Sequence, residues 1–219
     1  MPNWNENKKV RVVLADDHAM VREGLAQLLE ESKGIVVVGQ AADGIAALEL
    51  IRREDPDVAV LDYSMPHMDA VSATQQISRH HSRTRILVLT VHENVHYAIK
   101  VLQAGAHGFL IKAAAVDELV KAIRTVAEGK VYVSPAISEK MAETFQKGPS
   151  SRSGLSSLSV REFELLRMLG SGMRLQDCAK AMQVRESTVS TYRSRLMNKL
   201  NLKSTPEIIR FALENEIVG

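Results

Sequence analysis

The chain has 219 residues, enough for one large or two modest domains, and its 45% hydrophobic and 25% charged residues are typical of a globular protein. It contains no run of about 18 apolar residues, which excludes a membrane-spanning helix, and its start, MPNWNENKKV, lacks the apolar segment of a secretory signal peptide. The single cysteine, Cys178, excludes a disulfide within the chain and is typical of a protein of the reducing cytoplasm.

The net charge of +2 is unevenly distributed. Residues 150–219 contain 11 Lys and Arg against 7 Asp and Glu, whereas residues 1–149 contain 17 against 19. A basic module behind a slightly acidic one favours a nucleic-acid partner for the second part, although a solvated surface has the same balance.

The first part of the chain alternates strand-like and helix-like patterns. Strand-like apolar runs lie at residues 10–15, 35–41, 58–62, 86–90 and 107–111. Amphipathic helical patterns follow them at residues 18–30, 44–54, 69–80, 94–104 and 116–128. This alternation predicts an α/β fold, a doubly wound five-stranded parallel sheet with helices on both faces.

A serine-rich segment separates this part from the rest. Residues 145–159, FQKGPSSRSGLSSLS, predict a flexible linker. Residues 159–217 show no strand pattern and predict four short helices, at about 159–169, 174–182, 186–200 and 205–216. We therefore expect an N-terminal tail at 1–9, an α/β domain at 10–129, a partly helical linker at 130–154 and a small all-α domain at 155–219.

Polar residues stand where four of the predicted strands end. Asp16 and Asp17 follow the first strand, Asp62 ends the third, Thr90 ends the fourth and Lys112 follows the fifth. In a parallel sheet these ends meet at one edge, where chemistry is usually found. Three adjacent carboxylates repel one another unless a cation lies among them, and Mg²⁺ fits such oxygen ligands. A carboxylate beside Mg²⁺ can attack a phosphoryl group, whose oxygens the lysine and the hydroxyl can bind.

Each of these residues also has a purely structural interpretation. Asp17 could cap the helix that starts near His18, and Asp62 could be a turn residue. Thr90 could be an ordinary β-branched strand residue and Lys112 a solvated lysine. The coincidence of all of them at one sheet edge favours a site.

The segments LADDH, LDYSMPHMD, LTVHE and GAHGFLIK resemble those of a bacterial response-regulator receiver domain, across roughly residues 10–128. The resemblance implies that Asp62 is a phosphoacceptor. It also implies that Asp17, Asp62 and the backbone carbonyl of Ser64 ligate Mg²⁺, with Asp16 contributing indirectly.

The same resemblance implies a switch. Thr90 and Phe109 match the switch hydroxyl and the switch aromatic, and Lys112 matches the phosphate-binding lysine. Ala113 departs from the pattern, because the family frequently has a proline there, and so a cis peptide bond is not expected. Ser64 and His92 flank the site where the lifetime of the phosphorylated state is usually tuned.

Two other functions compete for the α/β domain. A phosphohydrolase would use Asp62 as nucleophile, but such enzymes usually need a second acid two residues later, where this chain has Ser64. Alternatively, the domain docks a protein or ligand without being phosphorylated, while the second domain binds DNA.

Residues 174–200 predict two helices joined by a short turn. The second helix has an apolar face, formed by Val189, Tyr192, Leu196 and Leu200. Its opposite face is small and polar, formed by Ser187, Thr191, Ser194 and Asn198, with Ser190 and Arg195 at the margins. The stretch TYRSRLMNKLNLK holds four basic residues and no acid. This composition suits a helix in a DNA major groove, although a protein-binding surface helix is the alternative.

LSVREFELL, the segment Gly172–Ala179 and TVSTYRSRLMNKLNLKS resemble the LuxR-type helix-turn-helix, across about residues 155–217. The resemblance implies two groups of DNA contacts. Base-proximal positions are Ser190, Thr191 and Ser194, and phosphate contacts are Arg193, Arg195 and Lys199. Arg185 departs from the family, which usually has a serine that caps the recognition helix.

A receiver joined to this module resembles the NarL/FixJ class of two-component response regulators, nearest its GacA-like members. The resemblance implies a cytoplasmic transcription regulator and not a turnover enzyme. A histidine kinase would phosphorylate Asp62 and thereby control homodimerisation and binding to double-stranded DNA, with RNA polymerase as a further partner. Cys178 is interpreted as a small buried hydrophobe, with a redox sensor as the alternative.

Overall fold

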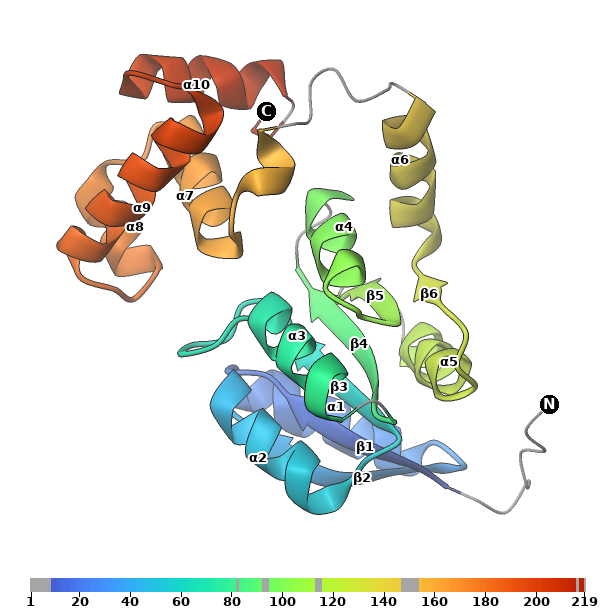
Figure 1. The fold of residues 1–219 in the computed structure, drawn as a ribbon. Helices are drawn as coiled ribbons and strands as arrows, with labels where there is room; N and C mark the ends of the chain where they lie inside the picture. The colour runs from blue at the N-terminus through green and yellow to red at the C-terminus, as the bar shows by residue number, and fades with distance from the viewer. Residues whose placement is uncertain are drawn as a thin grey trace. The chain divides into compact units, whose positions relative to one another are not determined.

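The computed structural model describes residues 9–81, 83–91, 95–112, 116–146, 154–215 and 217–218. The chain forms two compact units, Met1–Ala142 and Glu143–Gly219, which are considered separately below (Figure 1). None of the helices in the described ranges combines the length and the apolar character that a membrane crossing needs.

The first unit is built on a parallel sheet in the order β2-β1-β3-β4-β5-β6. Its first five strands were expected, and they are β1 (Val10–Ala15), β2 (Ile35–Ala41), β3 (Val58–Asp62), β4 (Arg85–Thr90) and β5 (Gly108–Ile111). The predicted number of strands was wrong by one, because β6 (Tyr132–Val133) pairs with β5. Two residues are too short a run to show the alternation that identifies a strand in a sequence.

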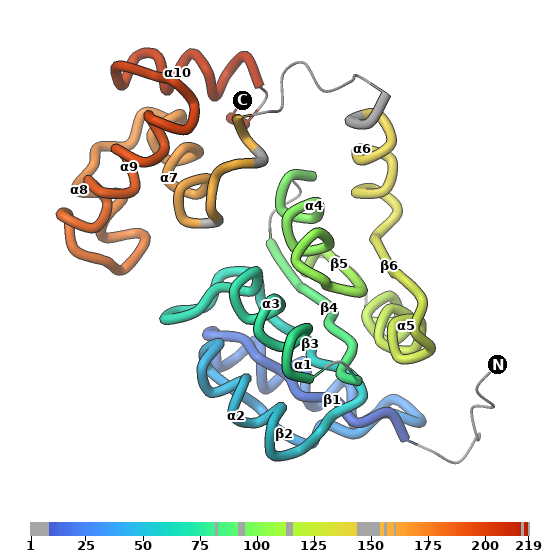
Figure 2. Tube along the Cα trace, viewed as in Figure 1, coloured from blue at the N-terminus to red at the C-terminus, as the bar shows by residue number. Residues whose placement is uncertain are grey.

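Helices cover both faces of the sheet (Figure 1), and the tube along the chain shows the same arrangement (Figure 2). One face is covered by α1 (Ala19–Glu31) and α5 (Val116–Ala127), and the other by α2 (Gly44–Glu54), α3 (Ala70–His80) and α4 (Val95–Gln103). All five residues of β3 are buried, because both of its faces are covered. Burial of each large aliphatic side chain stabilises the fold by roughly 1.5–3 kcal/mol. The packed central strands therefore fix the positions of the residues at their carboxyl ends.

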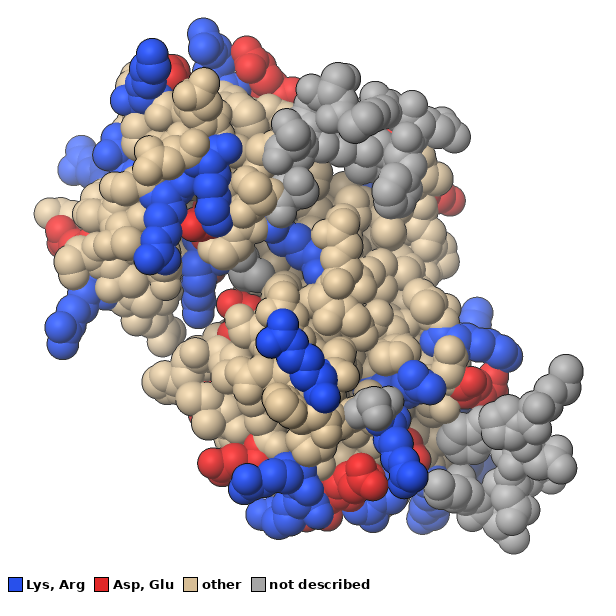
Figure 3. All heavy atoms as spheres, viewed as in Figure 1, with Lys and Arg blue, Asp and Glu red and all other residues tan. Residues whose placement is uncertain are grey.

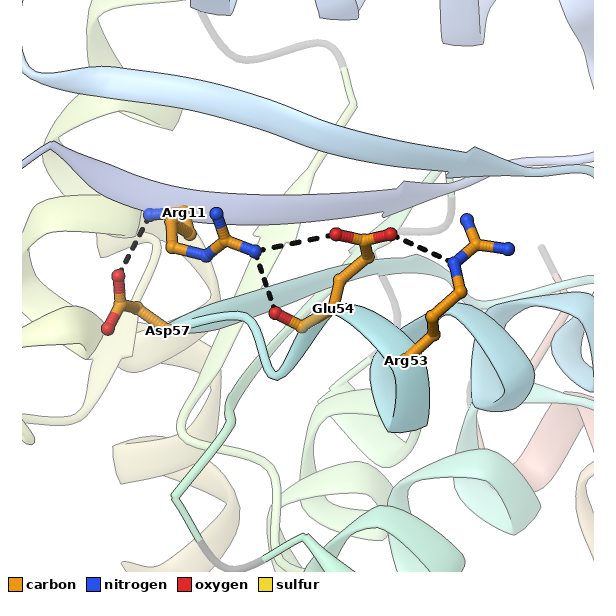
Figure 4. Close-up of polar contacts among 4 residues, drawn as sticks. All are labelled: Arg11, Arg53, Glu54 and Asp57. Atoms are coloured by element: carbon orange, nitrogen blue, oxygen red, sulfur yellow. Dashed lines mark hydrogen bonds and ion pairs between the residues drawn. The ribbon is translucent and has the colours of Figure 1, made fainter.

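Polar contacts fix the opposite, amino end of the sheet (Figure 4). The backbone N–H of Arg11 donates to Asp57 Oδ2 at 2.9 Å, and the Arg11 guanidinium donates to the Glu54 carbonyl oxygen at 2.7 Å. Arg53 Nε in turn donates to Glu54 Oε1 at 2.9 Å. These contacts join β1 to the connection that enters β3, and so they help to set the position of Asp62 at the far end of that strand.

The second unit contains the four helices expected from the sequence. They are α7 (Val160–Gly170), α8 (Leu175–Ala181), α9 (Glu186–Leu200) and α10 (Thr205–Glu214), preceded by the short 3₁₀ turn η2 (Leu155–Ser157). α7 packs against α9 and α10, and α8 packs against α9. The core of this unit includes the fully buried residues Phe163, Leu166, Leu196, Ile208 and Ala212. The additional helix expected after the sheet is present as α6 (Pro135–Gln146).

The helices of the second unit begin differently. Ser159 and Glu162 form a capping box at the start of α7, and the Ser204 side chain accepts from the Glu207 N–H at the start of α10. The N-cap residue of α9 is Arg185, and its side chain makes no capping hydrogen bond. The first backbone N–H groups of α9 therefore lack the side-chain acceptor that stabilises most helix starts.

We expect Arg185→Ser to stabilise the start of α9 by about 1 kcal/mol, because serine supplies the missing acceptor. Hydrogen exchange of the amides of residues 186–189, followed by mass spectrometry on the whole chain, should be slowed. Arg185→Ala is the matched control, since it removes a cation from the positive end of the helix without adding an acceptor. Equal exchange in the serine and alanine variants would show that capping is not the limiting interaction.

Candidate functional site

The carboxyl edge of the sheet gathers the polar residues expected there. Ligand atoms of Asp16, Asp17 and Asp62 lie within 4.8 Å of one another, together with His18. Lys112 Nζ lies 2.7 Å from Asp16 Oδ2 and 3.0 Å from Asp62 Oδ1. The parallel strands thus place three acids and one ammonium group in a single cluster, at the edge where such sheets carry out chemistry.

Burial controls the acidity of this cluster. Asp62 is 4% exposed, and its burial raises its pKa from 3.8 to about 6, while the charge and hydrogen bond of Lys112 only partly oppose this rise. Burial alone would lower the pKa of Lys112, but its hydrogen bonds and ion pairs with Asp16 and Asp62 outweigh burial and raise it. At neutral pH the cluster therefore combines an ionised Asp62 with a charged lysine.

The structural alternatives do not hold for Asp17, Asp62 and Lys112, whereas Thr90 lies in β4 as an ordinary strand residue would. The residue before α1 is His18, and no side chain caps this helix, so Asp17 is not its N-cap. Asp62 is the last residue of a buried strand and not an exposed turn. The Lys112 side chain is only 12% exposed, and so it is not a solvated lysine. Thr90, at the end of β4, is buried at 1% exposure.

Two residues of the cluster were missed in the sequence. His18 Nδ1 lies 2.8 Å from Asp17 Oδ1, and the His18 backbone N–H donates to Asp16 Oδ1 at 2.9 Å. Arg22 donates to the Asp16 carbonyl oxygen at 2.6 Å. Their closeness in sequence to the acidic pair was the available signal, because His18 directly follows Asp17 and Arg22 lies about one helical turn further along the chain.

The cluster has the chemistry of a site for a hard divalent cation. Three carboxylates against one ammonium leave an excess of negative charge, which Mg²⁺ bound through carboxylates and water would neutralise. Ser64, whose backbone carbonyl was expected to be a ligand, lies in the exposed loop that follows β3. His92, expected to influence the lifetime of the phosphorylated state, and Ala113, where no cis peptide bond was expected, lie outside the described residues.

Aromatic side chains fill the interior next to the cluster. Phe109, on β5, is fully buried in this structure. Tyr63, directly after Asp62, meets Tyr97 of α4 edge to face, with ring centroids 4.5 Å apart. Both tyrosines are 1% exposed. Tyr63, the residue that follows Asp62, is therefore in direct contact with α4.

In the second unit, α9 has the two faces that its sequence predicts. Val189, Leu196 and Leu200 are buried against the core. The opposite face is exposed and consists of Ser187, Ser190, Thr191, Ser194, Arg195 and Asn198. Figure 3 shows several Lys and Arg side chains, with few acids, on the visible face of this helical unit. A small polar helix face with basic neighbours suits the major groove of DNA.

The three basic residues expected to contact phosphate differ in their surroundings. Arg195 is exposed and has no ion-pair or hydrogen-bond partner among the described residues. Arg193 donates to the Thr205 hydroxyl at 3.0 Å. Lys199 Nζ lies 2.6 Å from Glu162 Oε2, and Glu162 is 2% exposed. Neither partner could be predicted from the sequence, since Glu162 precedes Lys199 by 37 residues and Thr205 follows Arg193 by 12.

Glu162 depends on Lys199. Burial alone would raise the pKa of Glu162, but hydrogen bonds from Lys199 and from Ser159 outweigh burial and lower it. The carboxylate is therefore kept ionised inside the unit by the lysine and by the capping box of α7. Lys199 thus has a structural role, whether or not it also reaches a phosphate.

Cys178 is fully buried, as expected for a small hydrophobe. Burial raises the pKa of its thiol. A protonated, enclosed thiol is a poor nucleophile, which disfavours the redox-sensor interpretation.

Comparison with known proteins matches both parts of the chain. Residues 12–124 match the response regulator receiver domain, and residues 156–212 match the luxR family of bacterial regulatory proteins. The chain is 36% identical over 206 residues to the response regulator UvrY of Escherichia coli K12, with 94% of each chain covered.

Two solved structures extend this similarity. The receiver domain of NarL from Mycobacterium tuberculosis is 44% identical, with a TM-score of 0.55, covering 56% of this chain and 99% of that one. RcsB from Salmonella enterica serovar Typhimurium, solved on the rprA promoter with the phosphomimetic BeF₃⁻, is 25% identical. The TM-score is 0.63, and the match covers 93% of this chain and 98% of the RcsB chain.

The raised pKa of Asp62 predicts a specific pH dependence of the metal-free protein. Because folding favours the protonated carboxyl, its contribution to the free energy of unfolding is complete below pH 3.8 and is lost as the pH rises through about 6. Asp62→Asn should therefore be more stable than wild type above that pH by about 2–3 kcal/mol.

Calorimetry of the first unit's transition in the presence of a chelator, from about pH 4 to about pH 8, measures this difference. Added Mg²⁺ should raise the midpoint of wild type and not that of Asp62→Asn. Asp69→Asn, at the N-cap of α3, is the control and should keep both wild-type responses. A stability difference that does not change with pH would contradict the role of burial.

The surroundings of the basic residues predict two different defects. Lys199→Ala leaves a buried carboxylate without its cation, and should destabilise the second unit by about 1–3 kcal/mol. Arg195→Ala should change stability by less than about 0.5 kcal/mol and reduce the slope of log affinity against log salt by about 1. Thermal unfolding measures the stability defect, and DNA titration at several salt concentrations measures the binding defect. If Lys199→Ala behaves as Arg195→Ala does in both assays, the structural role of Lys199 is wrong.

Proposed function

Because this chain belongs to the NarL/FixJ class of two-component response regulators, which join a receiver domain to a LuxR-type DNA-binding domain and regulate transcription, we propose that Asp62 is its phosphoacceptor. The observation that carries the proposal is the buried cluster in which Asp62 and Asp16 share Lys112. Asp62 is the acid with a raised pKa, held at the end of the most enclosed strand.

The reaction is a phosphoryl transfer from a phosphohistidine of a partner kinase. A carboxylate oxygen of Asp62 attacks phosphorus, the bond from phosphorus to the kinase imidazole breaks, and an acyl phosphate forms. Lys112 stays beside Asp62 and can bind a phosphoryl oxygen, with Thr90 binding another. Mg²⁺, held by Asp17, Asp62 and the Ser64 carbonyl and supported by Asp16, would supply neutralisation of the charge on the phosphoryl oxygens.

Transmission would run from Thr90 to Phe109 and then to α4, β5 and α5. Phe109 is already enclosed in this structure, so phosphorylation would stabilise this arrangement relative to one with the ring outside. A ligand shifts such an equilibrium only as far as it favours one state. The contact between Tyr63 and Tyr97 supports α4 as the helix that responds. The altered face would then form a homodimer or release the second domain.

DNA binding would be performed by residues 155–219, joined through residues 130–154 to a receiver at 10–129. Ser190, Thr191 and Ser194 face the bases and Arg195 faces the phosphates, with Arg193 and Lys199 near the backbone. Two such domains in a homodimer would read two half-sites and raise affinity by multivalency. We further propose that the protein works in the cytoplasm beside RNA polymerase, and that it accepts one phosphoryl group without turning over a substrate.

A small phosphodonor with Mg²⁺ tests the central assignment. Intact-protein mass should increase by one phosphoryl group in wild type and in the control Asp69→Asn, and not in Asp62→Asn. No gain in wild type, or a gain that survives Asp62→Asn, would remove Asp62 as the acceptor. Continuous release of phosphate from monoesters by wild type would instead favour a phosphohydrolase. Promoter binding measured on the same samples shows whether phosphorylation controls the second domain.

A further inference from the structure

The exposed face of α9 contains two hydroxyl groups whose protons are already used. Thr191 Oγ1 donates to the Ser187 carbonyl oxygen at 3.0 Å, and Ser194 Oγ donates to the Ser190 carbonyl oxygen at 3.0 Å. Both side chains are exposed. A hydroxyl has one proton and two lone pairs, so each of these groups can offer only lone pairs to a ligand outside the helix.

The neighbouring hydroxyls are less restricted. Among the described residues, the hydroxyls of Ser187 and Ser190 have no hydrogen-bond partner, so each can rotate to donate or to accept. Because they can do either, these two hydroxyls do not favour one base over another. Thr191 and Ser194 are therefore the positions on this face where the structure fixes the direction of a hydrogen bond.

Donors in the major groove are few. Adenine presents its N6 amino group and cytosine its N4 amino group, whereas guanine N7 and O6 and thymine O4 only accept. A locked hydroxyl facing guanine or thymine would place two acceptors together, unless it rotated and lost its bond within the helix. Thr191 also carries a methyl group, which can contact the thymine methyl of the same base pair.

We propose that the operator half-site has an A·T pair opposite Thr191, with the adenine amino group donating to the threonine hydroxyl, and that Ser194 accepts from the amino group of the neighbouring base pair. This inference rests on the proposed DNA-binding function of α9. Residues three apart on a helix are separated by about 4.5 Å along its axis, and base pairs are spaced by about 3.4 Å. The two contacts therefore fall on adjacent base pairs.

Selection from random duplex DNA with the full-length protein gives the first test. Wild type, Thr191→Val and Ser194→Ala are compared in parallel. Valine keeps the shape and a methyl group of threonine and removes the hydroxyl. The pair opposite Thr191 is the position whose preference weakens with Thr191→Val, and the pair opposite Ser194 is assigned in the same way. We expect A·T at the first position, and we expect the second position to lie next to it.

Base analogues then test whether the adenine amino group and the thymine methyl group make the proposed contacts. Replacing the assigned adenine by a purine that lacks the amino group should weaken wild type about tenfold and leave Thr191→Val almost unchanged. Replacing the paired thymine by deoxyuridine should weaken wild type and Thr191→Ser to different extents, because serine has no methyl group to lose a contact. Circular dichroism of each variant confirms that the helix content is unchanged.

The outcomes separate this inference from the function on which it rests. If wild type enriches no sequence and binds no duplex, DNA binding by α9 fails and this inference fails with it. If wild type enriches a G·C pair at the position assigned to Thr191, only the inference is overturned. Equal losses of wild type and Thr191→Val on the amino-free base would also overturn it.

Discussion

The ion pairs of Lys112 with Asp16 and Asp62 are the interaction on which the receiver depends. Two carboxylates that are 1% and 4% exposed would repel each other strongly without a cation between them. Lys112 reaches both at 2.7 and 3.0 Å because β5 ends beside β4, which lies next to β3. The lysine does not fully offset burial, since the pKa of Asp62 stays raised to about 6. The remaining excess of negative charge is what a bound divalent cation would neutralise.

Much of this arrangement could be predicted from the sequence, because it depends on local patterns. Five apolar runs, each followed by a helical period, define the sheet, and chain order alone brings Asp16, Asp17, Asp62 and Lys112 to one edge. β6 could not be predicted, since Tyr132–Val133 is too short to show a period. Partnerships between distant residues were also missed, as no local pattern joins Lys199 to a glutamate 37 residues earlier. The bonds from Thr191 and Ser194 are local, yet a sequence cannot specify which rotamer a hydroxyl adopts.

The interior beside Asp62 explains how a small chemical change can reach a helix. Tyr63 follows Asp62 directly and packs edge to face on Tyr97 of α4, and both rings are almost fully enclosed. Close-packed aromatic rings cannot shift by small independent amounts, so a movement of the loop after β3 must be accommodated by α4. Packing of Tyr63 on Tyr97 therefore joins the end of β3 to α4.

In the second unit, the polar contacts that stabilise the fold lie away from the exposed face of α9, which is the face that would meet DNA. Its ionised Glu162 is held by Lys199 and by the capping box of α7, whereas the recognition helix α9 begins without a side-chain cap. An arginine at that position is a poor cap, so the start of α9 has a positive charge in place of a capping acceptor. The hydroxyls of Thr191 and Ser194 are held by the helix backbone. Such an acceptor would discriminate between bases better than a freely rotating hydroxyl, because a rotation that accommodates a mismatched base breaks the bond within the helix.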